Sequence, residues 1–162
     1  MPPALRWTQR LFPLFCVLAI SCQRGPSIPD GDVAGALGAI TVIGTQPFAA
    51  KDLACKPALV MFVSPMCEHC VAEMPRASAA AAEAKANLVA VFVVGKQDDA
   101  EAIAKSTHFA GPILMDDGSL RKKYDITGVP YTLVLKPDGH AVAAFAGEQD
   151  EATIRNALAE AR

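Results

Sequence analysis

Two cysteines separated by two residues, Cys67 and Cys70, carry the strongest chemical signal in the chain. A thiolate is the nucleophile of disulfide exchange, and two thiols one helical turn apart on the same face can close into a disulfide. One thiol can therefore attack a disulfide of another protein, and the other can resolve the mixed disulfide. We expect Cys67 to attack and Cys70 to resolve, in a cycle that needs no cofactor beyond the pair.

The two residues between the cysteines, Glu68 and His69, would act on the thiolate in opposite directions. A protonated His69 would favour the thiolate and make the disulfide more oxidising, whereas Glu68 would disfavour it by like-charge repulsion. His69 can equally be read as a solvated residue at a helix start. The segment alone therefore leaves the direction of electron flow open.

The elements around the cysteines must place them where a thiolate is favoured. The continuous apolar run Leu59–Val63 predicts a buried central strand, and the alanine-rich sequence after it predicts a helix over 67–86, with Asn87 at its end. Cys67 then lies at the helix start, where unpaired N–H groups and the helix dipole favour an anion. This is the carboxyl end of a strand, where α/β sheets carry their sites.

The remaining pattern alternates strands with helices, which indicates a parallel βαβ unit and an α/β fold. Asp98 and Glu101 have the spacing of a capping box that opens a helix to about Ser106. Asp150 is expected to cap a last helix that packs on the sheet through Ile154, Ala157, Leu158 and Ala161. The other expected elements are strands at 39–43, 88–94, 113–115, 131–135 and 141–145, the last two as an antiparallel hairpin, and a helical turn at 119–124.

Two segments carry a family resemblance, F-V-S-P-M-C-E-H-C-V-A-E-M-P and T-G-V-P-Y-T-L-V-L-K-P-D-G, with Pro75 five residues beyond Cys70. Residues 39 to 162 resemble the thioredoxin superfamily, in particular its TlpA/ResA-like membrane-tethered branch of thiol-disulfide oxidoreductases. The resemblance implies a thioredoxin-like fold, a central mixed sheet flanked by helices with a hairpin after a cis-proline. It implies that Pro130 is cis and that the Val129 backbone pairs with an extended substrate segment. From the residues alone, Pro130 could be an ordinary trans loop proline.

Glu73 matches the acidic residue that ResA-like proteins carry three positions after the second cysteine. A partly buried carboxyl there could take or return the proton of the resolving thiol, or Glu73 could be a solvated helix residue. The chain departs from the family pattern at Met66, which replaces the usual tryptophan, and at Met61, which replaces the buried aspartate of thioredoxins proper. Met66 is expected either to shape an apolar docking surface or simply to pack.

The N-terminus has the pattern of a secretory signal, with Arg6 and Arg10 before the apolar run 11–20. The end of this run resembles a bacterial lipobox, which implies cleavage before Cys22 and lipidation of that cysteine, although the family usually has Leu where this chain has Ala19. Ordinary cleavage nearby and a buried core helix are the alternatives. Residues 23–38 are rich in Gly and Pro and predict a flexible tether, so we expect the domain over 39–162.

Composition limits the remaining possibilities. With 17 acidic residues against 15 basic ones, the chain is a poor candidate for binding nucleic acid. Cys55 precedes the central strand and Cys67 follows it, so the two are too far apart to bridge, and Cys55 is expected to be a small buried hydrophobe. A copper or zinc module built from Met66, Cys67, His69 and Cys70 is the rival from another class, although the spacing is poor and we expect no metal.

The resemblance also implies partners and a location. Together with the signal and lipobox patterns, it implies a periplasmic or cell-envelope protein that is lipid-anchored to a membrane and takes electrons from a membrane redox partner. Its substrates would be protein disulfides of specific exported targets, such as those of cytochrome c maturation or copper-site proteins. A general oxidant or isomerase is the alternative within the redox class.

Overall fold

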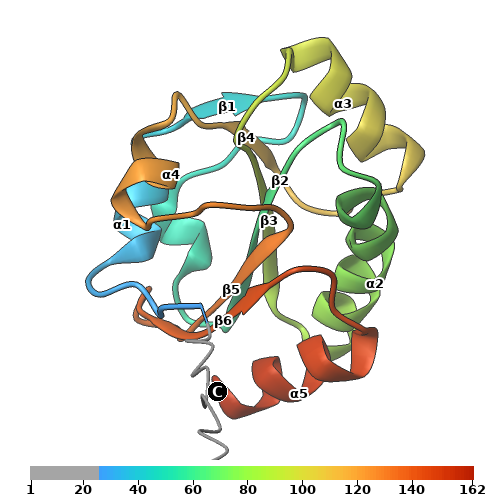
Figure 1. The fold of residues 1–162 in the computed structure, drawn as a ribbon. Coiled ribbons are helices and arrows are strands. Elements are labelled where there is room, and N and C mark those ends of the chain that lie inside the picture. Colours follow the sequence, from blue (N-terminus) through green and yellow to red (C-terminus); the bar gives the residue numbers. More distant parts are fainter. Residues whose placement is uncertain (1–25) are drawn as a thin grey trace, which may run out of the picture.

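The computed structural model describes residues 26–162. The predicted signal peptide, Cys22 and the first residues of the predicted tether lie outside this range. A six-stranded sheet in the order β1-β4-β3-β2-β5-β6 forms the centre of the molecule, with helices on both sides (Figure 1). The strands are β1 (Thr41–Ile43), β2 (Ala58–Val63), β3 (Asn87–Phe92), β4 (Ile113–Met115), β5 (Tyr131–Leu135) and β6 (Ala141–Ala146). The helices are α1 (Val33–Leu37), the 3₁₀ helix η1 (Ala50–Leu53), α2 (Glu68–Ala84), α3 (Gln97–Ser106), α4 (Ser119–Lys123) and α5 (Glu151–Glu160).

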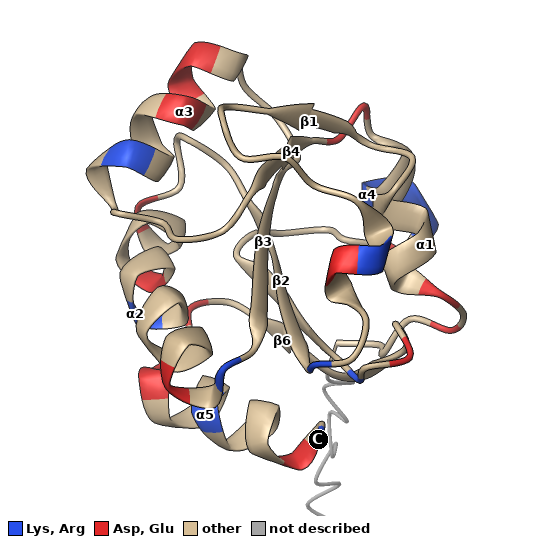
Figure 2. Cartoon of the chain, turned by 180° about the vertical axis from the view of Figure 1, so that it is seen from behind, with Lys and Arg blue, Asp and Glu red and all other residues tan. Residues whose placement is uncertain are grey.

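The sheet is mixed. Strands β2, β3 and β4 are parallel to one another, whereas β5 is antiparallel to β2 and β6 to β5. The parallel βαβ unit and the terminal hairpin are thus confirmed. None of the six strands contains a charged residue, so Lys, Arg, Asp and Glu lie on the helices and loops (Figure 2). Continuous apolar strands of this kind are expected where both faces of a sheet are covered.

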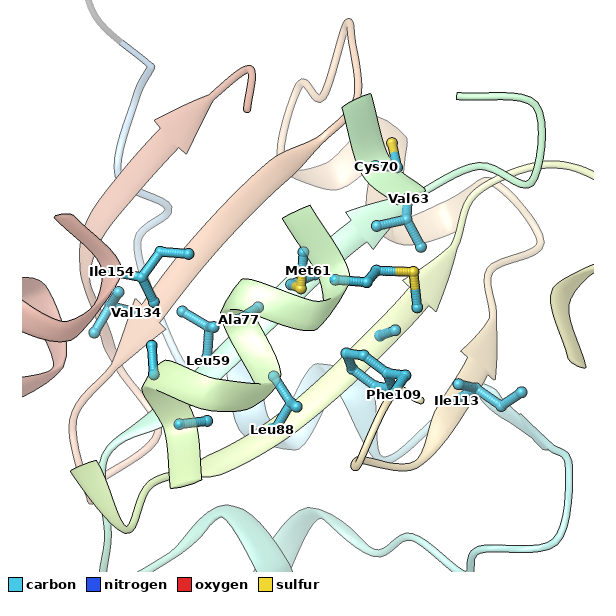
Figure 3. Packing of buried hydrophobic residues seen from close by; sticks show 14 of the residues in the cluster. Leu59, Met61, Val63, Cys70, Ala77, Leu88, Phe109, Ile113, Val134 and Ile154 are labelled. Carbon is cyan, nitrogen blue, oxygen red and sulfur yellow. The ribbon is translucent and has the colours of Figure 1, made fainter. Parts of the chain in front are cut away.

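Each face of the sheet has its own core. Helices α2, α3 and α5 cover one face, where Leu59, Met61 and Val63 of β2 pack with Ala77 of α2 and Ile154 of α5 (Figure 3). Helices α1, η1 and α4 cover the other face, with large buried side chains such as Phe62, Leu37 and Leu133. Alternation of strand side chains explains this division, because successive residues of β2 point to opposite faces. Cys70 lies at the edge of the first core, so the reactive turn is built directly on packed side chains.

The predicted tether is wrong for its last residues. Helix α1 lies within residues 23–38, and its Val33 and Leu37 are fully buried against the sheet. Asp32 caps this helix, since its side chain accepts from the Gly35 N–H at 2.8 Å. Further upstream, the Tyr131 hydroxyl donates to the Ser27 carbonyl at 2.8 Å. The folded part of the chain therefore begins before residue 39.

Two helix ends also differ from the prediction. Helix α2 ends two residues earlier than expected, with Lys85 rather than Asn87 in the left-handed conformation, and Asn87 begins β3. Helix α3 has Lys96 as its N-cap, so Asp98 and Glu101 form no capping box. Glu101 instead accepts from the side chain of Gln97 and from the backbone N–H of Gly44, which ties α3 to the loop after β1. By contrast, Asp150 caps α5 as predicted, accepting from the Thr153 N–H at 2.7 Å.

Across residues 26–162, the helices are all too short or too polar to cross a bilayer.

Candidate active site

Cys67 lies at the point where a sharp turn leads from β2 into α2. The Cys67 N–H donates to the Ser64 carbonyl at 3.2 Å, and the Met66 N–H donates to the Ser64 hydroxyl at 3.3 Å. Cys67 is the N-cap of α2, because its Sγ accepts from the Cys70 N–H at 3.1 Å. A sulfur in that position receives one of the helix's unpaired N–H groups and faces the positive end of its dipole. The expected environment for a reactive thiolate is therefore present.

Cys67 and Cys70 form a disulfide, with their Cα atoms 5.2 Å apart. Cys67 is partly exposed, whereas Cys70 is fully buried. A sulfur of another protein can therefore approach only the first of the two, which agrees with the predicted order of attack and resolution. Cys55 is a free thiol near the start of β2. It is exposed, so the prediction that it is a small buried hydrophobe is wrong, and with φ of 69° it occupies the left-handed region.

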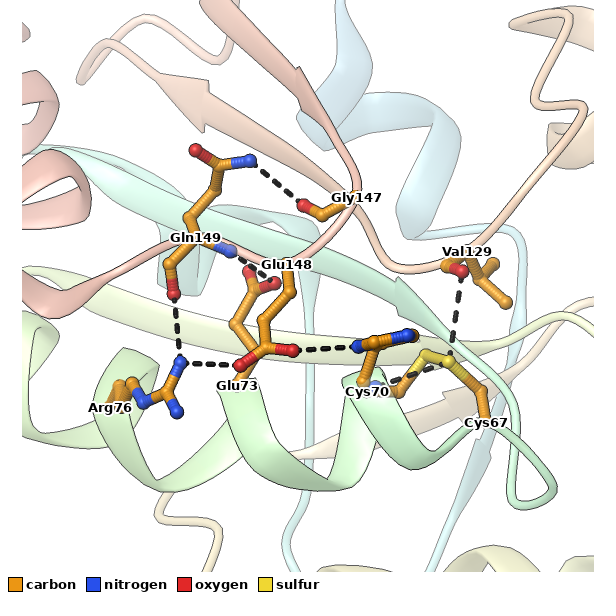
Figure 4. Close-up of polar contacts among 9 residues, drawn as sticks. Cys67, Cys70, Glu73, Arg76, Val129, Gly147, Glu148 and Gln149 are labelled. Atoms are coloured by element: carbon orange, nitrogen blue, oxygen red, sulfur yellow. Dashed lines mark hydrogen bonds and ion pairs between the residues drawn. A yellow bond between two sulfur atoms is a disulfide. The ribbon is translucent and has the colours of Figure 1, made fainter.

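The loop before β5 faces the cysteine pair. The Val129–Pro130 peptide bond is cis, as the family resemblance implied. The Val129 carbonyl oxygen lies 3.6 Å from Sγ of Cys67, within reach of that thiol when it is reduced (Figure 4). A shallow cavity of about 520 Å³ lies beside this loop, lined by Val129, Pro130 and residues of α2 and of the loop after β6. Val129 thus contacts Cys67 and also lines this cavity.

Glu73 is fully buried, which rules out the interpretation as a solvated helix residue. Its Oε1 accepts from the Thr132 hydroxyl of β5 at 2.8 Å, and its Oε2 accepts from the Gln149 N–H at 3.0 Å. Burial raises the pKa of Glu73, although these two hydrogen bonds favour the ionised form and oppose the shift. Glu73 is therefore a buried carboxyl with a raised pKa, one helical turn beyond Cys70.

A residue that sequence reasoning missed, Glu148, connects the active-site helix to the loop between β6 and α5. Its Oε2 accepts from Nδ1 of His69 at 2.7 Å, and its Oε1 accepts from the Arg76 guanidinium at 2.6 Å (Figure 4). The His69 bond and the Arg76 bond hold the pKa of Glu148 below its usual value. His69 is thus tethered by its side chain although its ring is 76% exposed. No local pattern signals this cluster, since 79 residues separate Glu148 from His69.

The remaining predicted site residues point outward. Met66 is 83% exposed beside the pair, so the interpretation as simple packing is wrong. Glu68 is exposed in the first turn of α2. Within the described residues, no group of three or more His, Cys, Asp or Glu side chains is placed to hold a metal ion. The structure therefore brings Cys67, Cys70 and Val129 into direct proximity and places Glu73 one helical turn deeper.

Comparison with known proteins agrees with this geometry. Residues 50–162 match the family model of the thioredoxin-like domain. The chain belongs to this family. It is 28% identical over 158 residues to the thiol:disulfide interchange protein DsbE of Pseudomonas fluorescens biotype C, a match that covers 90% of this chain and 87% of that protein.

Solved structures show the same fold. DsbF of Mycobacterium tuberculosis, in its mixed oxidised and reduced forms, superposes with a TM-score of 0.69 at 19% identity, covering 84% of this chain and 100% of that one. StoA of Bacillus subtilis gives a TM-score of 0.56 at 21% identity, over 64% of this chain and 83% of that one. Family membership and the Cys67–Cys70 disulfide together make this protein a thioredoxin-like thiol:disulfide oxidoreductase.

Proposed function

We propose that this oxidoreductase acts outside the cytoplasm and reduces disulfides of specific exported proteins. The observation that carries the proposal is the arrangement of the pair, with a partly exposed Cys67, a buried Cys70 and the Val129 carbonyl facing the first sulfur. The similarity to DsbE, a thiol:disulfide interchange protein, supports the same chemistry. The predicted signal sequence, which lies outside the described residues, supports export.

The proposed cycle begins with the reduced pair. The Cys67 thiolate attacks one sulfur of the substrate disulfide, the substrate S–S bond breaks, and the departing substrate thiolate takes up a proton. Cys70 then loses its proton and attacks Sγ of Cys67, which releases the second substrate thiolate and closes the Cys67–Cys70 disulfide. Two electrons have passed from the protein to the substrate. A membrane redox partner would return them by reducing the disulfide.

We assign Glu73 as the base that accepts the proton of Cys70. A carboxylate must be ionised to act as a base, and a raised pKa makes it a stronger one. Its burial one turn from Cys70, with bonds to Thr132 and Gln149 that fix its orientation, supports this role. Docking is assigned to Val129 and Pro130, through backbone pairing with an extended substrate segment, and to the exposed Met66 as an apolar contact.

We propose that a lipid anchor is attached to the protein at Cys22. Lipidation there would hold the domain at a bacterial membrane, close to an electron donor in that membrane. Incorporation of labelled palmitate by the full-length protein, and its loss in Cys22→Ser, would support the anchor. Equal incorporation by both proteins would refute it.

The reduction potential of Cys67/Cys70 tests the direction of electron flow. A reductant should have a potential closer to that of thioredoxin, about −270 mV, than to that of DsbA, about −120 mV. Equilibration of the purified protein with glutathione or dithiothreitol buffers would measure it. A value near that of DsbA would reject the reductant.

One observation favours the alternative, a general oxidant or isomerase. The Cys70 N–H donates to Sγ of Cys67 at the start of α2, and stabilisation of that thiolate raises the potential of the disulfide. The same potential measurement separates the two functions.

A further inference from the structure

The loop between β6 and α5 is fixed to α2 through both oxygens of one carboxylate. Glu148 pairs with His69 at 2.7 Å and with Arg76 at 2.6 Å, and its side chain is only 27% exposed. Arg76 also donates to the Gln149 carbonyl at 3.5 Å. Since His69 and Arg76 are seven residues apart, they lie two turns apart on one face of α2. Glu148 therefore holds the loop along two turns of the active-site helix.

Glu73 occupies the same face of α2, between these two residues in the helix. Its carboxyl turns inward, where the Thr132 hydroxyl of β5 and the Gln149 N–H of the loop donate to it. Gln149 directly follows Glu148, so the contact that holds the loop and the contact that covers Glu73 are adjacent in the chain (Figure 4). The complete burial of Glu73 therefore depends on where this loop lies.

The charged and polar groups around Glu73 come from each element packed against it. Helix α2 contributes Cys70 and the positive charge of Arg76, β5 contributes the neutral Thr132, and the loop contributes the Gln149 N–H and the negative charge of Glu148. Among the causes that shift the pKa of Glu73, burial is the largest and raises it. The bonds from Thr132 and Gln149 lower it, Glu148 raises it and Arg76 lowers it.

We propose that Glu148 is a positioning residue of the redox site, which clamps the β6–α5 loop onto His69 and Arg76 and thereby seals Glu73 from water beside Cys70. This inference rests on the proposed role of Glu73 as the base for Cys70. Glu148 would thus affect proton transfer from Cys70 through Glu73, without contacting either cysteine.

Removal of the Glu148 contacts should change the pKa of Glu73 in a definite direction. In Glu148→Gln the negative charge leaves and the loop opens more often, so water reaches Glu73. Both changes lower the pKa of Glu73. Loss of the Gln149 bond would raise it, but burial is the larger cause. We therefore expect the midpoint of Glu73 ionisation to move to lower pH.

The matched control is Glu83. Glu83 of α2 pairs with Arg155 of α5 at 3.2 Å, its side chain is 59% exposed, and it lies away from Glu73. The change Glu83→Gln removes the same charge and leaves the clamp intact. It should leave the ionisation of Glu73 where it is.

The experiment uses NMR on the oxidised protein, the Glu148→Gln variant and the Glu83→Gln variant. The carboxyl carbon of Glu73 reports its ionisation, and exchange of the Gln149 amide with solvent reports opening of the loop. Loss of the partly exposed contacts of Glu148 with His69 and Arg76 should speed that exchange by about threefold to tenfold in Glu148→Gln. Arg76→Gln breaks the clamp from the other side and should speed it as well.

The proposal would be overturned if Glu148→Gln left both the exchange rate of the Gln149 amide and the midpoint pH of Glu73 ionisation unchanged. Equal changes of these two quantities in Glu83→Gln would overturn it as well. Neither readout depends on turnover. If Glu73→Gln retained full activity, the role of Glu73 as a base would fail, and the NMR result would still decide whether Glu148 seals it.

Discussion

Two buried carboxylates in this molecule, Glu73 and Asp116, lie in contrasting surroundings. Asp116, 6% exposed, lies between β4 and α4, where Oδ1 accepts from the Leu120 N–H at 3.1 Å and Oδ2 from the Arg121 N–H at 3.0 Å. A carboxylate at a helix N-terminus stabilises the N–H groups that the helix leaves unpaired. Asp116 thus stabilises the start of α4 through hydrogen bonds to its backbone.

Glu73 is more deeply buried but has no helix N-terminus to stabilise its charge. It has one hydroxyl and one backbone N–H as donors, and burial raises its pKa. Buried carboxylates with a perturbed pKa occur preferentially at functional sites. The two carboxylates therefore differ in their surroundings: Asp116 bonds to the first backbone N–H groups of a helix, whereas Glu73 is buried beside the redox pair with a raised pKa.

The largest effect on turnover is expected at the attacking sulfur. Cys67→Ser removes the nucleophile, so reduction of a disulfide-containing protein should fall to the uncatalysed background. Cooperative unfolding in urea, followed by circular dichroism, would verify that the variant is folded. If Cys67→Ser retained disulfide turnover, the Cys67–Cys70 pair would not carry the reaction, and Glu73 would have no catalytic role beside it.

The next largest effect is expected at Glu73 itself. Glu73→Gln keeps the shape of the protonated acid but cannot accept the proton of Cys70, so turnover should fall by about a hundredfold or more. The pH profile of the resolving step should also lose its dependence on Glu73. Full activity with an unchanged pH profile would contradict the role of Glu73 as a base and leave it only a structural role, like that of Asp116.

The same variant tests the energetic side of the comparison. The folded pKa of Glu73 lies above its unfolded value, so the folded state binds the extra proton and the wild-type protein loses stability as pH rises through that interval. Glu73→Gln should lack this loss and gain stability relative to the wild type towards neutral pH. Urea unfolding of both proteins between pH 4 and 8 would measure the difference, and parallel curves would contradict the raised pKa.

A smaller effect is expected from the hydroxyl that donates to Glu73. Thr132→Val removes a bond that favours the ionised form, so the pKa of Glu73 should rise further and the pH midpoint of the resolving step should move up. This direction is opposite to that expected for Glu148→Gln. Turnover at neutral pH should fall severalfold, as measured by stopped-flow kinetics of the resolving step. A midpoint that stayed in place or moved down would contradict the assignment of Thr132 as a donor that favours the ionised form of Glu73.

The smallest effect on turnover is expected at Asp116. Asp116→Ala leaves buried N–H groups of α4 without an acceptor and should cost about 1–3 kcal/mol of unfolding free energy. Turnover per folded molecule should stay at the wild-type level. Urea unfolding and steady-state kinetics on the same preparation would measure both quantities, and a loss of turnover without a loss of stability would reverse the assignment of the two carboxylates.

The parts of the site that could be predicted are those whose signals are local. The cysteine pair, the strand before it, the cis-proline and the cap at Asp150 each depend on a few neighbouring residues, or on a motif that the family resemblance supplied. Glu148 could not be found in this way, because its role arises only when the end of β6 meets α2 across many tens of residues.

The errors have physical causes. Helix α1 was hidden among glycines and prolines, and its stability depends on burying Val33 and Leu37 rather than on helix propensity. Asp98 satisfied the spacing of a capping box, but α3 begins one residue before it, at Gln97. Cys55 was expected to be buried on the strength of its residue type, whereas a turn before β2 leaves it in solvent.

The exposure of Cys55 has a practical consequence for experiments on this protein. In the oxidised state it is the one free thiol within residues 26–162, and the length of β2, about 20 Å, separates it from the redox pair. A maleimide dye should therefore attach at Cys55 without blocking Cys67. Energy transfer from that dye to a labelled substrate would then follow docking in real time.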